Sequence, residues 1–298
     1  MHGLIDERSG QIPVQQLCKL AGVPRASYYR AARVPVTPRP DRNESVTREI
    51  RSICEEMPRY GSPRVTKELR RRGYWVNHKR VFRLMRKENL HCRRKRRFVH
   101  TTDSNHNFRV YPNLAKELVP ARPNQLWRAD ITYIRLVAEF VYLAVILDAY
   151  SRRVVGWALS RHIDAALTVA ALRMAIEQRG IHPGLIHHSD QGVQYACDEY
   201  VKMLHDHQIA ISMSRRGNPY DNAMAESFMK TLKVEEVYIN EYSSFSDAYS
   251  NIERFIGIVY NKKRLHSSIG YRTPEEIEAH FHNKISTLAI PETVSTTG

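Results

Sequence analysis

The stretch WRADITYIRL (127–136) alternates apolar and polar residues, and FVYLAVILDAYSRRVVGWALS (140–160) follows it as two apolar runs around a turn. Alternation with a period of two is typical of a strand that buries one face, and short apolar runs between turns are typical of buried strands. These residues therefore predict three sequential strands joined as a meander.

The residues after this meander alternate between helical and strand patterns. Helical patterns cover 164–180, 197–209 and 221–237, and strand patterns cover 183–190 and 210–214. The resulting order of three strands, helix, strand, helix, strand and helix is that of a ribonuclease-H-like α/β core. We expect this core, closed by two further helices within 245–281, to span 123–282 and a flexible tail to follow at 283–298.

Three acidic residues stand out within this region, because each lies in a stretch that is typical of a site. They are Asp130, Asp190 and Glu226, with 59 residues between the two aspartates and 35 between Asp190 and Glu226. The predicted elements place Asp130 on a central strand, Asp190 at the end of a neighbouring strand and Glu226 on a flanking helix. Asp221 is predicted to cap that helix.

This acidic set is suited to divalent cations. Two Mg²⁺ ions roughly 4 Å apart can activate the attacking oxygen and stabilise the leaving oxygen in phosphodiester chemistry. Such hard cations prefer carboxylate oxygens, so Asp130 is expected to bridge two Mg²⁺ ions while Asp190 and Glu226 each bind one, with Mn²⁺ as a substitute. Without metal, mutual repulsion is expected to raise the pKa values of the three carboxyl groups.

Positive charge is concentrated before this region. The chain carries a formal net charge of +15; residues 1–124 contain 28 Lys and Arg against 11 Asp and Glu, whereas residues 125–298 contain 18 against 20. Clustered Lys and Arg bind polyanions by neutralising phosphates and releasing counterions. We therefore expect the first part of the chain to bind nucleic acid.

Two helical units are predicted in this basic part. Residues 12–31, within a unit at 1–33, have a helix-turn-helix outline, although a plain helical hairpin has the same pattern. A linker with three prolines follows at 34–43. The second unit, 44–92, ends in a helix with a row of cations suited to a DNA backbone or groove, and a basic linker follows at 93–122. The predicted DNA-binding residues of this unit and linker are Lys79, Arg80, Arg83, Arg86, Lys87, Arg93, Arg94, Lys95, Arg96 and Arg97.

Composition excludes several other classes. The four cysteines form no C-x-x-C pair, so a structural zinc site is not expected, and no early segment has the apolar run of a signal peptide or a membrane span. A reduced, cytoplasmic protein without membrane partners is expected.

The chain resembles the OrfB portion of transposases of the bacterial insertion-sequence three family. The stretches that carry the resemblance are YGSPRVTKELRRRG (60–73), WRADITYI (127–134), LDAYSRRVVGW (147–157), HHSDQGVQY (187–195), RRGNPYDNAMAESFMKTLK (215–233) and YNKKRLHSSIGYRTP (260–274). The family signature adds a basic residue seven positions after the glutamate, which is Lys233 here. On a helix, Lys233 and Lys230 share the stripe of Glu226, so both are expected to contact DNA.

The resemblance implies a DNA transposase with an integrase-type core that cleaves 3′ ends at the terminal inverted repeats of an element and joins them to target DNA. It implies a copy-out, paste-in route through a circular intermediate, a dimer or larger homo-oligomer on double-stranded DNA, and a bacterial, nucleoid-associated location. In this family an upstream OrfA-type product often supplies a further helix-turn-helix and a zipper by frameshift fusion. No sustained heptad repeat occurs in this chain, so two alternatives stay open: the chain acts alone, or it acts with an OrfA-type product as a fusion or partner.

Two other functions fit the same residues. A DNA-binding regulator of transposition would use the basic part and leave the acidic set idle. A nuclease of the same fold would use the acidic set for hydrolysis alone.

Overall fold

A computed structural model describes residues 5, 7–32, 43–90, 109–215 and 221–288. The chain divides into two compact units, residues 1–49 and residues 50–298. Across the described ranges, no helix is both long enough and apolar enough to cross a membrane.

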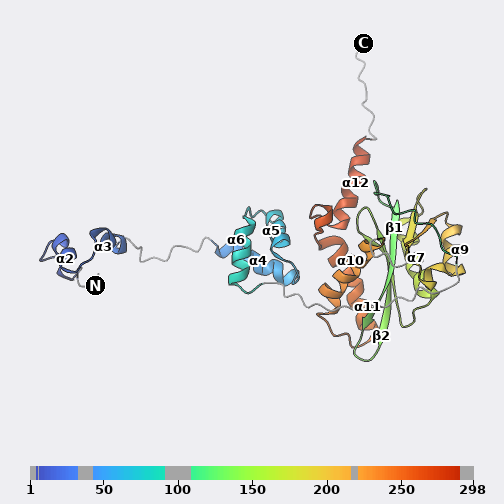
Figure 1. The fold of residues 1–298 in the computed structure, drawn as a ribbon, viewed down its shortest axis with the longest axis horizontal. Helices are drawn as coiled ribbons and strands as arrows, with labels where there is room; N and C mark the ends of the chain where they lie inside the picture. The colour runs from blue at the N-terminus through green and yellow to red at the C-terminus, as the bar shows by residue number, and fades with distance from the viewer. Residues whose placement is uncertain (1–4, 6, 33–42, 91–108, 216–220, 289–298) are drawn as a thin grey trace, which may run out of the picture. The chain divides into compact units, whose positions relative to one another are not determined.

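The first unit contains a helical pair within residues 7–32. Helix α2 (Val14–Leu20) and helix α3 (Arg25–Ala32) are separated by Gly22, whose φ of +63° is a conformation that glycine adopts without strain (Figure 1). Leu17 and Cys18 pack with Tyr28 and Ile5 in a small buried cluster. The two helices and the turn predicted here are confirmed, and their role in DNA binding stays a prediction.

Three helices follow, α4 (Glu44–Glu56), α5 (Ser62–Arg71) and α6 (His78–Lys87). Asn77 caps α6, because its side-chain oxygen accepts the Lys79 N–H at 2.8 Å. The residues that α5 and α6 bury are those with helical periodicity in the sequence, namely Val65, Leu69, Val81, Leu84 and Met85. Since one face of α6 is buried in this way, its cations lie on the remaining faces.

A five-stranded sheet forms the centre of the compact unit made by residues 50–298. Its strands are β1 (Leu126–Arg135), β2 (Phe140–Asp148), β3 (Val154–Ser160), β4 (Ile186–Ser189) and β5 (Ala210–Met213), in the order β3-β2-β1-β4-β5. The first three strands pair antiparallel, whereas β4 pairs parallel to both β1 and β5. The predicted meander is therefore confirmed, and Asp130 lies on the central strand.

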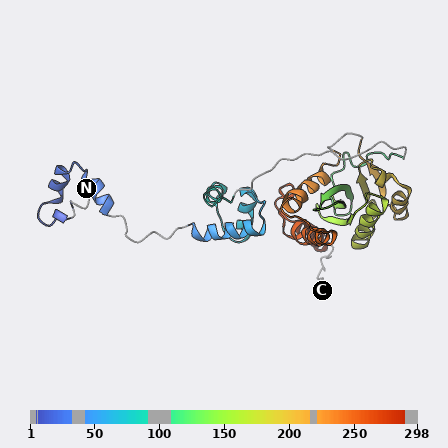
Figure 2. The same cartoon turned by 90° about the horizontal axis from the view of Figure 1, so that it is seen from below.

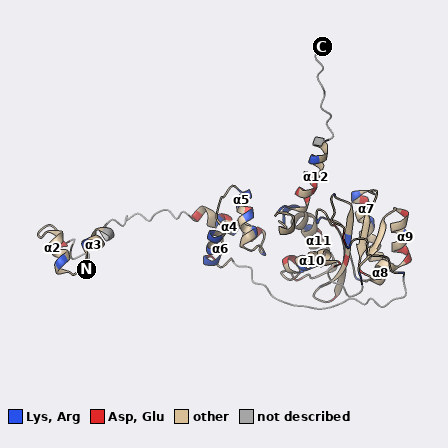
Figure 3. Cartoon of the chain, turned by 45° about the horizontal axis from the view of Figure 1, so that its top comes forward, with Lys and Arg blue, Asp and Glu red and all other residues tan. Residues whose placement is uncertain are grey.

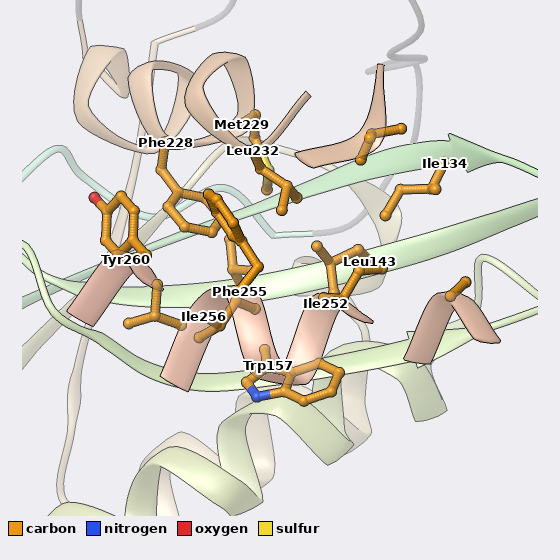
Figure 4. Packing of buried hydrophobic residues seen from close by; sticks show 14 of the residues in the cluster. Ile134, Leu143, Trp157, Phe228, Met229, Leu232, Ile252, Phe255, Ile256 and Tyr260 are labelled. Atoms are coloured by element: carbon orange, nitrogen blue, oxygen red, sulfur yellow. The ribbon is translucent and has the colours of Figure 1, made fainter. Parts of the chain in front are cut away.

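Helices cover both faces of the sheet (Figure 2). One face packs against α7 (Ala165–Arg179), α8 (Val193–Ala196) and α9 (Asp198–Asp206). The other packs against α10 (Ala223–Leu232), the π-helical segments η1 (Lys233–Val237) and η2 (Phe255–Lys263), and α11 (Phe245–Arg254). In this second layer Phe228, Phe255 and Tyr260 belong to the same buried cluster as Leu143 of β2 (Figure 4). Together these layers form the mixed α/β core that the order of patterns predicts.

The end of the core differs from the prediction. After the short 3-10 helix η3 (Ser267–Ile269), helix α12 runs from Pro274 to Leu288, so the predicted start of a flexible tail at residue 283 was wrong. Neither proline nor glycine interrupts the chain between Pro274 and Leu288, and the Ser286 hydroxyl donates to the His282 carbonyl at 3.0 Å. The helix therefore continues, and the rest of the predicted tail, 289–298, lies outside the described residues.

The segment between η2 and α12 contacts α5 and the loop before it. The Leu265 N–H donates to the Tyr60 hydroxyl at 2.7 Å, and Arg64 donates to the Leu265 carbonyl at 3.0 Å. Beside Leu265, Arg264 forms a mostly buried ion pair with Glu235 of η1 at 2.7 Å. This segment therefore joins α5 and the loop before it to the layer that contains α10.

Candidate active site

Asp130 lies in the middle of β1, opposite Val145 of β2. Its side-chain oxygen accepts the Ile131 N–H at 2.9 Å, and the residue is only partly exposed. The adjoining strand β4 pairs with β1 from Leu126 to Arg128 and no further. Asp130 therefore lies just beyond the end of the β1–β4 ladder, where a side chain from β4 can approach it.

Asp190 follows directly after β4, at that same end of the ladder. Its carboxylate accepts the Gly192 N–H at 3.0 Å, and a Cβ added at Gly192 would lie 3.0 Å from the same carboxylate oxygen. The Gln191 side chain donates to the Ser214 carbonyl at 2.9 Å, beyond β5. A tight turn thus holds Asp190, and its glycine leaves room for the carboxylate.

The two histidines before Asp190 are buried and hold the strands that carry it. His188 hydrogen-bonds through its two ring nitrogens to Ser212 at 2.8 Å and Ser214 at 3.1 Å, while His187 bonds the Tyr200 hydroxyl at 2.8 Å. Burial, the largest cause in each case, lowers the pKa of His187 to about 3 and that of His188 to about 4. Both rings are therefore neutral at physiological pH and act in packing.

Glu226 lies in the first turn of α10 and is exposed. Its N–H donates to the Asn222 carbonyl at 3.2 Å. Asn222, rather than Asp221, is the N-cap residue, so the predicted capping role of Asp221 was wrong. The Asp221 carboxylate instead accepts from the Arg215 backbone N–H at 3.0 Å and from the Arg215 guanidinium at 3.2 Å.

The charges of Asp190 and Glu226 act on the carboxyl group of Asp130. The pKa of Asp130 is raised to about 8, first by burial, then by the negative charges of Asp190 and Glu226, while the charge of Lys233 opposes the rise. The three predicted residues therefore lie close enough to interact although they come from β1, the end of β4 and α10. The predicted rise in pKa is found for Asp130, but burial contributes more to it than the repulsion on which the prediction rested.

Lys233 lies at the junction of α10 and η1. Its ammonium group is 4.2 Å from the centre of the Tyr133 ring on β1, a cation–π contact. Burial lowers the pKa of Lys233, and the charge of Asp130 opposes that effect. Lys230, one turn after Glu226, is exposed. The two predicted lysines thus differ, since Lys233 faces the carboxylates and Lys230 faces solvent.

The donor set fits a divalent cation in its chemistry, because all three groups are carboxylates and repel one another. Among the described residues, however, no three His, Cys, Asp or Glu side chains already form a ligand cluster. Glu226 is exposed, and rotation of its side chain can change its distance from Asp130. The same three residues would therefore hold the metal, with Asp130 in the central position.

The predicted DNA-binding cations fall into two groups. Those of α6 are Lys79, Arg83, Arg86 and Lys87, which are exposed, and Arg80, which is partly exposed. Figure 3 shows Lys and Arg along α5 and α6, whereas the core carries both signs. The second group, Arg93 to Arg97, lies outside the described residues.

The sequence predicted no role for two residues that support the site, Arg128 and Asn222. The Arg128 guanidinium donates to the Asp221 carbonyl, and the Asn222 amide donates to the Ala129 carbonyl at 2.9 Å. Both bonds join positions 93 residues apart. A local pattern contains no signal for such partners, although their positions beside Asp130 and Glu226 could have directed attention to them.

The chain matches three domain families. Residues 120–219 and 207–274 match two families described as an integrase core domain, and residues 40–98 match an HTH-like domain. These ranges include helices α4 to α6, the five-stranded sheet, and Asp130, Asp190 and Glu226.

Individual proteins show the same relationship. The chain is 37% identical over 268 residues to an insertion element IS600 uncharacterized 31 kDa protein of Shigella sonnei, covering 89% of this chain and 98% of that one. It is 33% identical over 279 residues to the transposase InsF for insertion sequence IS3A of Escherichia coli K12, covering 92% and 96%. Among solved structures, the HTLV-2 integrase catalytic core domain in complex with magnesium is 17% identical with a TM-score of 0.40, covering 53% of this chain and 98% of that one.

Proposed function

The chain belongs to the IS3 family of insertion-sequence transposases, as an OrfB protein, and we propose that it cleaves the 3′ ends of its element and transfers them to target DNA. One observation carries the proposal. Asp130 lies on the central strand just beyond the β1–β4 ladder, Asp190 directly follows β4 at that same end, and the Asn222 amide joins the start of the Glu226 helix to Ala129. Three acids gathered at one end of a sheet in this way are suited to phosphodiester chemistry with divalent metal ions.

The proposed roles of the carboxylates follow from their positions. Asp130 lies on the central strand, Asp190 directly follows the neighbouring strand β4, and Glu226 lies in the first turn of α10. Its pKa of about 8 means that the metal-free carboxyl is mostly protonated at neutral pH and must release this proton before both oxygens can act as ligands. Two Mg²⁺ ions, or Mn²⁺ in their place, would activate water and then the 3′-hydroxyl, and stabilise the leaving oxygen.

Cations of the chain complete the proposed reaction site. Lys233, beside Asp130, is positioned to contact a phosphate of the reacting strand, and Lys230 is exposed on the same helix. The cations of α6 are proposed to hold the terminal inverted repeats through phosphate contacts. Pairing two element ends requires a dimer or a larger homo-oligomer on DNA. Whether the chain acts alone or with an OrfA-type partner, as a fusion or a separate chain, is left open by this proposal.

A joining assay tests the proposed function. Purified protein is incubated with Mg²⁺ or Mn²⁺ and labelled duplex ends taken from the DNA that flanks its gene. Joined products support transposition, nicks alone support a hydrolytic nuclease, and binding without either product supports a DNA-binding regulator.

Asp190→Asn and Asp206→Asn form a matched pair for this assay. Asp206 is an exposed acid at the end of α9, so its variant controls for the loss of one negative charge. We expect Asp190→Asn to abolish joining and Asp206→Asn to retain it. Equal activity in the two variants would contradict the assignment of Asp190.

A further inference from the structure

The three carboxylates are attached to the fold in unequal ways. The strand of Asp130 pairs with β2 along its whole length, and the strand before Asp190 is bonded to both β1 and β5. Helix α10, which carries Glu226, rests on the sheet through the apolar side chains of Ala225, Phe228, Met229 and Leu232. Apolar contact is not directional, so it leaves the rotation and axial position of a helix weakly specified. A directional contact is needed to set Glu226 relative to Asp130.

Asn222 makes that directional contact. Its side-chain amide donates to the Ala129 carbonyl at 2.9 Å, and the residue is buried. Ala129 directly precedes Asp130 and is the first residue of β1 beyond the ladder with β4. At the other end, the Asn222 carbonyl accepts the Glu226 N–H. The residue before Asp130 is therefore connected to Glu226 by one side-chain hydrogen bond and one helical turn.

A second bond fixes the same turn. Arg128 donates to the carbonyl of Asp221, whose carboxylate is in turn bonded to Arg215. Two successive residues of β1, Arg128 and Ala129, thus bind two successive residues before α10. Such a double attachment restricts rotation as well as distance.

The Asn222 side chain does not cap α10, although Asn222 is the N-cap residue. An asparagine at an N-cap usually accepts a backbone N–H of the first helical turn, as Asn77 does at α6. Within the described residues, the Asn222 side chain makes no such cap bond, and its buried Oδ1 has no hydrogen-bond partner. Both omissions weaken the helix terminus, so the orientation of the amide serves the bond to β1 rather than the stability of α10.

We propose that Asn222 is a positioning residue, which sets the Glu226 helix relative to Asp130 so that the carboxylates can share the divalent cations. This inference rests on the proposed function. When a residue that orients the ligands of a metal without binding the metal itself is removed, metal affinity typically falls by 10- to 100-fold. We expect loss of the Asn222 amide to raise the Mg²⁺ concentration at half-maximal response about ten-fold.

The chain contains a matched control in Asn261. Its buried side chain also hydrogen-bonds to the backbone of a strand. The amide oxygen accepts the Val154 N–H at 3.0 Å, and the amide nitrogen donates to the Val154 carbonyl at 3.1 Å. Val154 lies on β3, the edge strand, with β2 between it and β1. Asn261→Ala therefore removes comparable bonds without touching the attachment of α10 to β1.

The test compares wild type, Asn222→Ala, Asn222→Leu and Asn261→Ala by two Mg²⁺ titrations. One measures the metal-dependent rise in melting temperature, which does not require activity, and the other measures joined DNA. Leucine has the same number and branching of side-chain heavy atoms as asparagine but lacks the donor, so it keeps the site filled if the alanine variant does not fold.

We expect both Asn222 variants to shift the Mg²⁺ midpoint in both titrations, and Asn261→Ala to lower the metal-free melting temperature while keeping the wild-type midpoint. Unchanged midpoints in the Asn222 variants, or an equal shift in Asn261→Ala, would overturn the positioning role. A wild-type protein without any metal response would overturn the proposed function and this inference with it.

Discussion

Helices α6 and α10 have ten residues each, but they contribute to function in different ways. Helix α6 carries several cations of one kind, and its N-cap asparagine caps the helix. Helix α10 carries a single carboxylate of a set of three, and its N-cap asparagine bonds a strand instead. From this difference we expect the contacts of α6, the proposed DNA-binding helix, to be similar and partly replaceable, and the site at α10 to lose its function when one carboxylate is lost.

The largest effect is expected for Glu226→Gln. The amide keeps the size of the side chain and removes the charge, so joining should fall on the order of a thousand-fold while binding to the element end is retained. Glu199→Gln, at an exposed carboxylate on α9, is the control and should retain most activity. Quantifying joined product on labelled ends checks this, and retained joining in Glu226→Gln would remove the difference between the two helices.

A double variant on α6, Arg83→Ala with Lys87→Ala, is expected to have the next largest effect. Loss of two phosphate contacts should reduce the salt slope of DNA binding by about two and the affinity by roughly ten- to a hundred-fold. Joining at saturating DNA should persist, because the carboxylates are intact. The control is Arg173→Ala with Lys202→Ala, which removes two exposed cations from α7 and α9. An equal loss of DNA affinity in this control would show that only the net charge of the protein matters.

Lys233→Gln should have a smaller effect than either. Its ammonium group lies beside Asp130, whereas that of Lys230 is exposed, so we expect about a ten-fold loss of joining for Lys233→Gln and less than two-fold for Lys230→Gln. Loss of the Lys233 charge should also raise the pKa of Asp130 further. Equal losses for the two lysines would mean that they act only as general phosphate contacts.

The smallest effect concerns the stability of the metal-free protein. The pKa of Asp130 is about 8 in the fold against 3.8 for the unperturbed group, so its favourable contribution is complete below pH 3.8 and is lost as the pH rises through about 8. Asp130→Asn lacks this loss, and its melting temperature should exceed that of wild type by about 5 °C at pH 9. Melting curves in EDTA at pH 6 and pH 9 check the difference, and saturating Mg²⁺ should reduce it.

Much of the fold could be predicted because its patterns are local. Alternation in 127–136 identified β1, and the spacing of Val81, Leu84 and Met85 identified the buried face of α6. The π-helical segments η1 and η2 were not predicted, because a helical apolar pattern does not distinguish α from π hydrogen bonding. The end of α12 was also missed, since polar composition alone does not end a helix.

The sequence by itself determined which groups are present: hard carboxylate donors at Asp130, Asp190 and Glu226, and a row of cations on α6 whose common face follows from helical periodicity alone. Only the tertiary structure decided how the carboxylates interact, that His187 and His188 are neutral packing residues, and that Asn222 binds Ala129. The physical reason is distance along the chain. Burial, Coulomb interaction and a hydrogen bond across 93 residues depend on where strands and helices meet, which no local stretch of residues specifies.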